Sequence, residues 1–273
     1  MRPLTQKETK MTCGVTLRRD PAREPCFKVA QLQTELEDYV GMTEVSKRQR
    51  LHRHMHNEMQ NLEITCQTLV DFPDTGWETR LQLARQCWDE ARHTQLVRRR
   101  LEAHGGKKGD FPVMNYEWGT VCLMDSLAAR LTLQNRTFEA SEMDLFRQLI
   151  GSWTQAGDLE TAAMLDGILA DEVQHVRFAN QWLKRVSKED PKILMKVASA
   201  IGYLKKVTAA LAPEPGAKNA AGVELTTWTH LDVSTNVGDR ELAEFTPVEI
   251  AEVLRREGFG QLAANLLAEK AQP

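Results

Sequence analysis

Two short segments of the chain repeat one pattern of acidic and histidine residues. Glu90 is followed three residues later by His93, and Glu172 is followed three residues later by His175. Positions i and i+3 point to one side of an α-helix, so each pair can approach a metal ion from a single helix. Carboxylate and neutral imidazole suit iron or manganese with coordination positions left open for oxygen. The repeated pattern therefore predicts a metal centre.

A glutamate lies at a matching distance before each pair. Glu58 precedes Glu90 by 32 residues, and Glu139 precedes Glu172 by 33 residues. In a helical hairpin, equal lengths of chain on either side of the turn bring such residues level. Dinuclear carboxylate sites in helix bundles take one glutamate from each of two helices and a Glu-x-x-His pair from each of the others. We therefore expect six metal-binding and catalytic residues: Glu58, Glu90, His93, Glu139, Glu172 and His175.

Three further acidic residues are expected to support these ligands. Glu63 lies about five residues, or roughly 7 Å, out of register with Glu90, so it ranks behind Glu58 as a supporting residue or additional ligand. Asp89 and Asp171 are expected to hydrogen-bond the outward nitrogens of the metal-bound histidines. The alternative for these two is an ordinary solvated acid. Three histidines before Glu58 are expected to form hydrogen bonds and not to bind metal: His52, His54 and His56.

A metal-free reading stays open. A single Glu-x-x-His pair arises readily by chance as a solvated pair on a helix surface, and the chain would then be a helical interaction module. Two copies, each preceded by a correctly spaced glutamate, are harder to obtain by accident. Burying four carboxylates in one core without cations would also cost many kcal/mol. The pattern therefore favours metal binding.

Long helices are needed to position these residues, and the sequence predicts four. Residues 44–72 contain no proline or glycine, and their apolar stripe has helical spacing: Leu51, Met55, Leu62, Cys66 and Leu69. A second helix is expected over 77–103. A third starts near 113 and reaches Glu139, with a restart capped by Ser141, before Gly157. The fourth runs from Asp158 to about 186. Short connections make these helices two antiparallel hairpins of a four-helix bundle.

The flanking regions differ from this bundle. Residues 1–43 are predicted to be an arm outside the core with one helix around 29–39. Beyond the bundle (44–187), the extension over 188–273 begins with a helix at 192–211 and a Pro/Gly/Ala-rich linker. Thr246, Pro247 and Glu249 then form a helix start signal. The expected fold class is all-α.

Composition limits the partners of the 273-residue chain. A net charge of -3 and a pI near 6.2 provide no basic field, which argues against nucleic acid and favours a small-molecule substrate. Five cysteines without a C-x-x-C pair fit a reducing compartment, so the cytoplasm is expected. No apolar run approaches the ~18 to 20 residues of a membrane span, and no membrane partner is expected.

Several segments resemble a known family. The chain is similar to the ferritin-like diiron-carboxylate superfamily and, more narrowly, to a bacterial ferritin-like family of unknown function. That family carries the motifs H-x-E-L-Q-A-I-E-L, E-A-x-H, G-D-x-P and D-E-x-x-H-V in this order. The resemblance covers about residues 45–187. Besides Glu139-Ala140, the segments that carry it are LHRHMHNEMQNLE (51–63), GDFPVMNYEW (109–118) and AGDLETAAMLDGILADEVQHV (156–176).

The resemblance implies a ferritin-like bundle with two iron ions, or a manganese and an iron ion, that activate O2. The expected reaction is hydroxylation, N-oxygenation or desaturation of a small organic substrate. Asn61 and the D-E-A-R-H form of the second motif depart from the family pattern and suggest a biosynthetic tailoring enzyme. Two alternatives are a ferroxidase or iron-handling protein and a tRNA-modifying diiron hydroxylase. An external electron donor, ferredoxin or flavoprotein reductase, and a homodimer are left open.

Overall fold

The computed structural model of the chain describes residues 4–225 and 235–270. These residues are mostly helical, and the predicted all-α class of helical-bundle type is confirmed. The chain forms two compact units: residues 1–134 with 192–231, and residues 135–191 with 232–273. The two ends of the chain, residues 1–3 of the predicted arm and 271–273 of the predicted extension, and residues 226–234 of that extension lie outside the described residues. The predicted domain boundaries stay a prediction.

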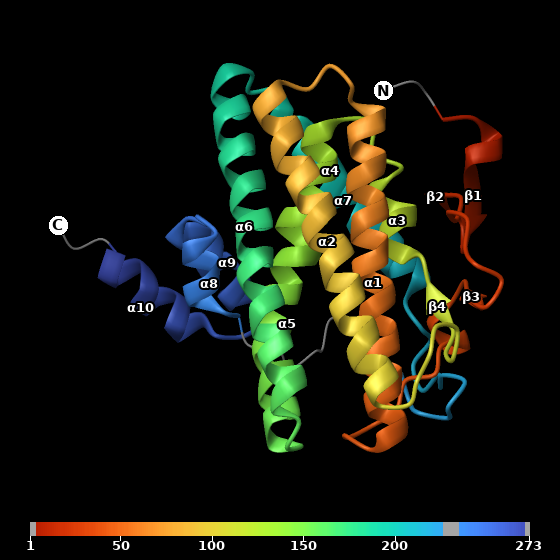
Figure 1. The fold of residues 1–273 in the computed structure, drawn as a ribbon. Coiled ribbons are helices and arrows are strands. Elements are labelled where there is room, and N and C mark those ends of the chain that lie inside the picture. The colour runs from red at the N-terminus through yellow and green to blue at the C-terminus, as the bar shows by residue number, and fades with distance from the viewer. Residues whose placement is uncertain (1–3, 226–234, 271–273) are drawn as a thin grey trace. The chain divides into compact units, whose positions relative to one another are not determined.

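The first unit is built on the hairpin of α1 (Glu44–Asp71) and α2 (Trp77–Ala103), which lie side by side in Figure 1. Both helices have the bounds that the sequence predicts, to within a residue. The side chain of Thr43 caps α1 by accepting a hydrogen bond from the Ser46 amide. At the facing surface, apolar side chains from both helices are buried, which stabilises the hairpin. They include Leu51, Met55, Leu83 and Val97.

The second half of α1 buries a different face from the predicted stripe. Cys66 is exposed, whereas Thr65 and Thr68 are buried. Each threonine hydroxyl donates to the carbonyl four residues earlier at 2.8 Å, and Thr65 also accepts a hydrogen bond from Gln134 at 2.8 Å. Because these hydroxyls are paired, the helix can bury a polar face. The spacing of apolar residues therefore predicted the wrong buried face for the second half of α1.

The predicted third helix is wrong in its first half. The segment forms β4 (Val113–Met114), α3 (Tyr116–Val121) and α4 (Leu127–Leu133). Ser126 caps α4 by accepting from the Ala129 amide at 3.2 Å. Arg130 is fully buried and donates to the carbonyls of Cys122 and Met124, both at 3.3 Å. The break between α3 and α4 is tolerated because the guanidinium satisfies carbonyls that helix bonding leaves free.

The arm also differs from its prediction. In place of a helix, β3 (Val29–Ala30) pairs in parallel with β4 and is followed by the 3-10 turn η2 (Gln33–Glu35). After the 3-10 turn η1 (Gln6–Glu8), strands β1 (Thr9–Thr12) and β2 (Val15–Arg18) form an antiparallel hairpin. Val15 and Leu17 are buried, so the prediction that the arm lies outside the core is wrong. Pairing between distant segments overrides local preference here.

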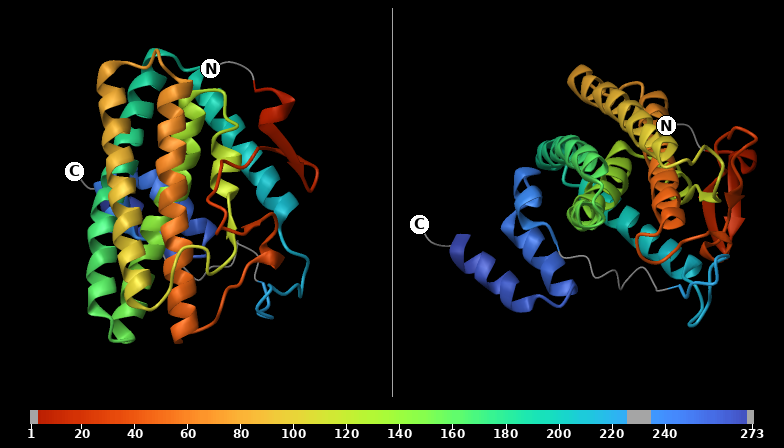
Figure 2. Two further views of the ribbon diagram at one scale, coloured as in Figure 1. Left: turned by 45° about the vertical axis from the view of Figure 1, so that its right-hand side comes forward. Right: turned by 60° about the horizontal axis from the view of Figure 1, so that its bottom comes forward.

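The first unit is completed by α7 (Ile193–Leu211), which the sequence predicts. It packs against α4 and β2, and Figure 2 shows its cyan ribbon beside the red N-terminal hairpin. The Tyr203 hydroxyl donates to the Thr16 carbonyl of β2, and the Tyr116 hydroxyl lies 2.9 Å from that of Thr208. These contacts tie the arm and α7 into one packed unit.

The second unit contains the other predicted hairpin. The π-helical segment η3 (Gln134–Glu139), which starts at the unit boundary, leads directly into α5 (Ala140–Gln155). Gly157, at a φ of 80°, ends this run, and Asp158 caps α6 (Leu159–Glu189) through the Thr161 amide at 3.0 Å. Ser141 is not a cap: its hydroxyl donates to the Thr137 carbonyl at 2.7 Å. The predicted restart is a change to π geometry.

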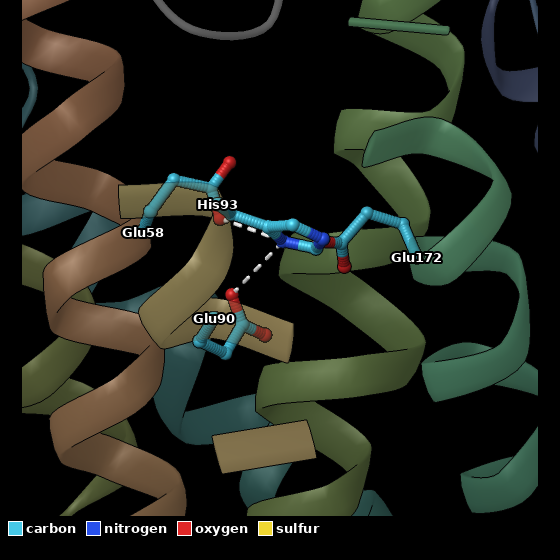
Figure 3. A group of neighbouring side chains, drawn as sticks. All are labelled: Glu58, Glu90, His93 and Glu172. Carbon is cyan, nitrogen blue, oxygen red and sulfur yellow. Dashed lines mark ion pairs between the residues drawn. The ribbon is translucent and has the colours of Figure 1, made fainter. Parts of the chain in front are cut away.

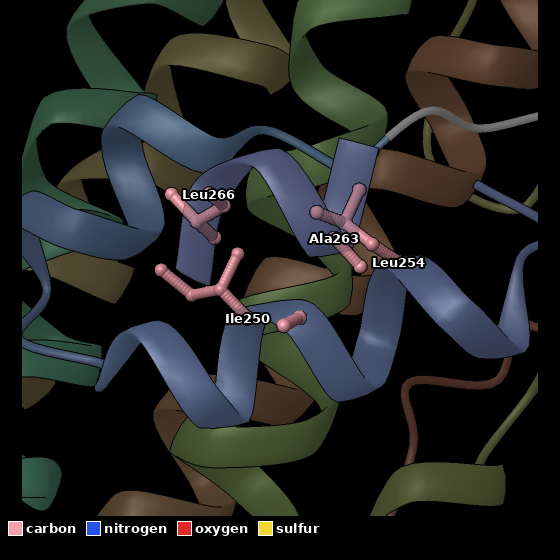
Figure 4. Packing of buried hydrophobic residues seen from close by; sticks show 5 residues of the cluster. Ile250, Leu254, Ala263 and Leu266 are labelled. Atoms are coloured by element: carbon pink, nitrogen blue, oxygen red, sulfur yellow. The ribbon is translucent and has the colours of Figure 1, made fainter. Parts of the chain in front are cut away.

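Three short helices extend this unit: α8 (Val237–Leu242), α9 (Pro247–Arg256) and α10 (Gly260–Lys270). The Thr246 capping box that the sequence predicts is present at the start of α9. Figure 4 shows apolar side chains of α9 and α10 packed together, among them Ile250, Leu254 and Leu266. No described helix has both the length and the apolar character needed to cross a bilayer.

Candidate metal centre

The first unit brings three of the predicted ligands together. Glu58 of α1 and Glu90 and His93 of α2 each offer one ligand atom, and these atoms lie within 4.8 Å of one another. All three side chains are buried. The His93 Nδ1 atom lies 3.4 Å from Glu58 Oε2 and 3.6 Å from Glu90 Oε2, as the dashed lines in Figure 3 show. We call these residues the first group.

Glu58 is held as an anion by two imidazoles. His54, one turn earlier on α1, places its Nε2 atom 2.6 Å from Glu58 Oε1. Burial by itself raises the pKa of Glu58, but the hydrogen bonds and charges of His54 and His93 outweigh burial and hold that pKa below its ordinary value. The contact of the buried Oε2 atom with His93 Nδ1, at 3.4 Å, is long, and among the described residues no hydrogen bond of good geometry reaches this oxygen. This oxygen therefore has lone pairs available to a cation.

The second unit brings the other three predicted ligands together. Glu139 ends the π-helical segment, and Glu172 and His175 lie one turn apart on α6. Their ligand atoms also lie within 4.8 Å of one another, and all three residues are buried. The His175 Nδ1 atom lies 3.3 Å from Glu172 Oε2. We call these residues the second group.

Asn135 anchors the second group, and the sequence analysis missed it. Its Nδ2 atom donates to Glu139 Oε2 at 2.8 Å and to the carbonyl of His175 at 3.4 Å. Asn135 precedes Glu139 by four residues, as His54 precedes Glu58. Gln86 also precedes Glu90 by four residues and donates to its Oε1 at 3.4 Å. A polar side chain four residues before three of the four glutamates was the signal that could have identified Asn135.

The chemistry of each group fits a divalent cation. Two carboxylates and one imidazole carry up to two negative charges, and burying such a set without a counter-charge is costly. Oxygen and nitrogen donors in this ratio suit iron or manganese. In the described part of the chain, neither group contains the thiolates that are common in structural zinc sites. The buried Glu/His groups could therefore hold metal ions.

The predicted supporting acids behave differently from one another. Glu63 belongs to neither group, and its Oε1 atom forms an ion pair with Arg23 Nη1 at 2.6 Å. Asp89 is buried and forms an ion pair with Arg92 at 3.2 Å. Asp171 is partly buried. The role of Asp89 and Asp171 in orienting the histidines stays a prediction.

The histidines before Glu58 form hydrogen bonds, as expected. His54 contacts Glu58, as described above. His52 accepts a hydrogen bond from the Gly109 backbone amide at 2.9 Å, and His56 Nδ1 lies 3.3 Å from the side-chain Nε2 atom of Gln60. Burial lowers the pKa of His52 to about 4 and that of His56 to about 3. Both imidazoles are therefore neutral at neutral pH.

Comparison with known proteins gives a single finding. The model of a family described as "Protein of unknown function (DUF455)" matches residues 4–250. This range includes both groups and extends beyond the segments that carry the ferritin-like resemblance. Comparisons with curated proteins and with solved structures found no match.

Proposed function

Because the chain belongs to the DUF455 family, whose description assigns no function, we propose its function from its own residues: a diiron oxidoreductase that activates O2 and oxidises a small organic substrate. The observation that supports this proposal is the recurrence of one buried ligand set. Each unit contributes two glutamates and one histidine with ligand atoms within 4.8 Å. We assign one iron ion to each group.

The donor set favours redox chemistry over a structural role. Each group offers carboxylates and an imidazole, the donors that suit redox-active iron or manganese, and its described residues include none of the thiolates that are common in structural zinc sites. Iron bound there would supply the one-electron steps and the O2 binding that no side chain can provide. Glutamates can bind a metal through one oxygen or two, so the same residues can accommodate a change in iron charge.

The chain's own residues keep the ligands in place and correctly protonated. His54 and His93 hold Glu58 ionised, so that its carboxylate needs no deprotonation before it binds a cation. Asn135 fixes one oxygen of Glu139 through an amide that does not titrate. Such partners of ligand side chains orient them and raise metal affinity.

The choice of substrate class rests on charge. The net charge of -3 offers no field that would attract a polyanion, so a small organic molecule is favoured over tRNA. Hydroxylation, N-oxygenation and desaturation are all compatible with the ligand set. Each of these reactions removes two electrons from the substrate and needs two more to complete the reduction of O2. An external ferredoxin or flavoprotein reductase would supply these two electrons.

Anaerobic reconstitution with ferrous iron tests the proposal. We expect two iron ions per chain and, on admission of O2, a visible absorption band that needs both iron and oxygen. Glu63→Gln is the matched control because it removes a carboxylate from α1 that belongs to neither group. A chain that binds no iron and stays colourless would rule out the proposal. Iron oxidation without consumption of any organic compound in a metabolite screen would indicate an iron-handling protein instead.

A further inference from the structure

Two cysteines face each other on the α1–α2 hairpin. The Sγ atoms of Cys66 and Cys87 lie 3.4 Å apart. Cys66 is exposed and Cys87 is partly buried. Neither belongs to the first or second group. No local pattern predicts this pair, because the two residues lie on different helices and 21 positions apart.

The geometry is close to that of a disulfide. An S–S bond is about 2.05 Å long, so the two sulfur atoms need to approach by roughly 1.4 Å, which side-chain rotation and a small helix adjustment can supply. Burial and the neighbouring Cys66 raise the pKa of the Cys87 thiol. Cys87 therefore stays protonated at neutral pH, and the exposed Cys66 is the partner that an oxidant reaches first.

A shallow groove gives small molecules access to Cys66. The groove has a volume of about 320 Å³ and is lined by residues of the arm, α1 and α3, including Pro21, Cys66 and Trp118. The Glu63 carboxylate on its wall is held by Arg23 at 2.6 Å. Wide, open access of this kind suits a small and unselective oxidant, and hydrogen peroxide or a small organic hydroperoxide fits this description.

We propose that Cys66 and Cys87 are a redox-active dithiol that a hydroperoxide oxidises to a reversible disulfide between α1 and α2. The Cys66 sulfur attacks the peroxide, a sulfur–oxygen bond forms, the O–O bond breaks, and water or an alcohol leaves with the thiol proton. The Cys87 sulfur then attacks the sulfenic acid on Cys66. The S–S bond forms, the S–O bond breaks, and a water molecule leaves with the Cys87 proton.

This step is balanced and does not depend on the proposed function. The two thiols lose two protons and two electrons, and one peroxide gains them. In a reducing compartment, disulfides are usually transient, catalytic or redox-sensing, so a reversible bond agrees with the cysteine content of the chain. The bond would form in a metal-free chain as well as in a metal-loaded one.

Peptide mapping of the full-length chain tests the proposal. The protein is treated with one equivalent of hydrogen peroxide, as purified and again after chelator treatment, then alkylated and digested with trypsin without reduction. Cleavage after arginine isolates Cys66 in the peptide of residues 54–80 and Cys87 in the peptide of residues 86–92. We expect these two peptides linked as the main oxidised species, and complete release of the link by dithiothreitol.

Single substitutions separate the roles of the two thiols. Cys87→Ser should leave a sulfenic acid on Cys66 that dimedone traps, whereas Cys66→Ser should abolish both the trapped species and the link. Cys26→Ser, at another exposed cysteine, is the matched control and should leave the link unchanged. Circular dichroism checks that each variant is folded.

Over-oxidation of Cys66 without a link, or links that join Cys13 or Cys26 as readily, would overturn the proposal. If the link forms only in the metal-loaded protein, the direct reaction of thiol with peroxide is also wrong.

Discussion

The first and second groups have the same ligand set on different backbones. Glu58 lies within an unbroken α-helix of 28 residues, whereas Glu139 ends a π-helical segment of six residues. Each glutamate is nevertheless anchored by a side chain four residues earlier, the imidazole of His54 in one case and the amide of Asn135 in the other. π-Helical turns inside α-helices are rare and frequently occur at functional sites. The two groups therefore share the four-residue spacing between each glutamate and the side chain that holds it, but they differ in backbone conformation and in the type of that side chain.

Removal of a ligand from one group tests whether the groups bind independently. His93→Ala should abolish iron binding by the first group, and His175→Ala should abolish it in the second, because each leaves two carboxylates without their imidazole. Each variant should retain about one iron per chain in place of two. Equilibrium dialysis followed by metal analysis gives these values. Loss of both ions from either variant would show that the groups bind only together, and unchanged iron content in both would exclude the ligand assignment.

Each unit contains a buried arginine–aspartate pair whose loss should destabilise it. Arg130 pairs with Asp71 in the first unit, and Arg240 pairs with Asp144 at 2.6 Å in the second. Arg240→Met should lower the free energy of unfolding by about 3 to 5 kcal/mol, because the buried Asp144 loses its charged partner. Arg130→Met should cost less, because Arg18 also forms an ion pair with Asp71 at 3.4 Å. Urea unfolding measures this change.

Arg98→Met is the control for both variants. Its ion pair with Glu102 is exposed, so the expected loss is below about 1 kcal/mol. Equal effects of the buried and exposed substitutions would contradict the role given to the buried pairs.

The two anchors should affect affinity less than the ligands do. His54→Ala and Asn135→Ala should each weaken iron binding by the affected group about 10- to 100-fold, because the glutamate loses the partner that orients it. Titration with ferrous iron under anaerobic conditions provides the two affinities. Asn135→Asp is a sharper variant, because it keeps the size of the side chain and replaces the donor with a second negative charge. An iron affinity unchanged in all three variants would show that His54 and Asn135 do not help their glutamates to bind metal.

The smallest effect concerns acid stability of the first unit. Burial lowers the pKa of His52 to about 4 and of His56 to about 3, while an unfolded chain titrates near 6.5. The unfolded state therefore binds more protons below about pH 6.5, and the free energy of unfolding should decrease as pH falls from there toward 4. His52→Gln should flatten this decrease. Parallel pH profiles for the original chain and the variant, measured by urea unfolding, would contradict this expectation.

Much of the helical framework was predictable because its ends are set by local chemistry. Thr43, Gly157, Asp158 and the capping box at Thr246 mark helix boundaries by hydrogen bonds and φ preferences that depend on neighbouring residues alone. The periodic Glu-x-x-His pairs likewise follow from the geometry of one helix. These features needed no knowledge of tertiary contacts.

The failed predictions all depend on contacts between distant segments. The break before α4 is stabilised by the buried Arg130, and the strand at Val29 exists because it pairs with Val113. No local pattern contains that information. Asn135 is a different case, because its contact with Glu139 is local, four residues along the chain, and it was missed because asparagine is not among the usual iron ligands. The roles of Asp89 and Asp171 stay predictions.

The most direct test of the central claim is Mössbauer spectroscopy of the chain reconstituted with isotopically enriched ferrous iron and then oxidised by O2. The proposed diiron function predicts two ferric ions per chain that are antiferromagnetically coupled and therefore diamagnetic at low temperature. Two magnetically isolated ferric ions, or a single ion per chain, would contradict a diiron centre even if each group binds metal.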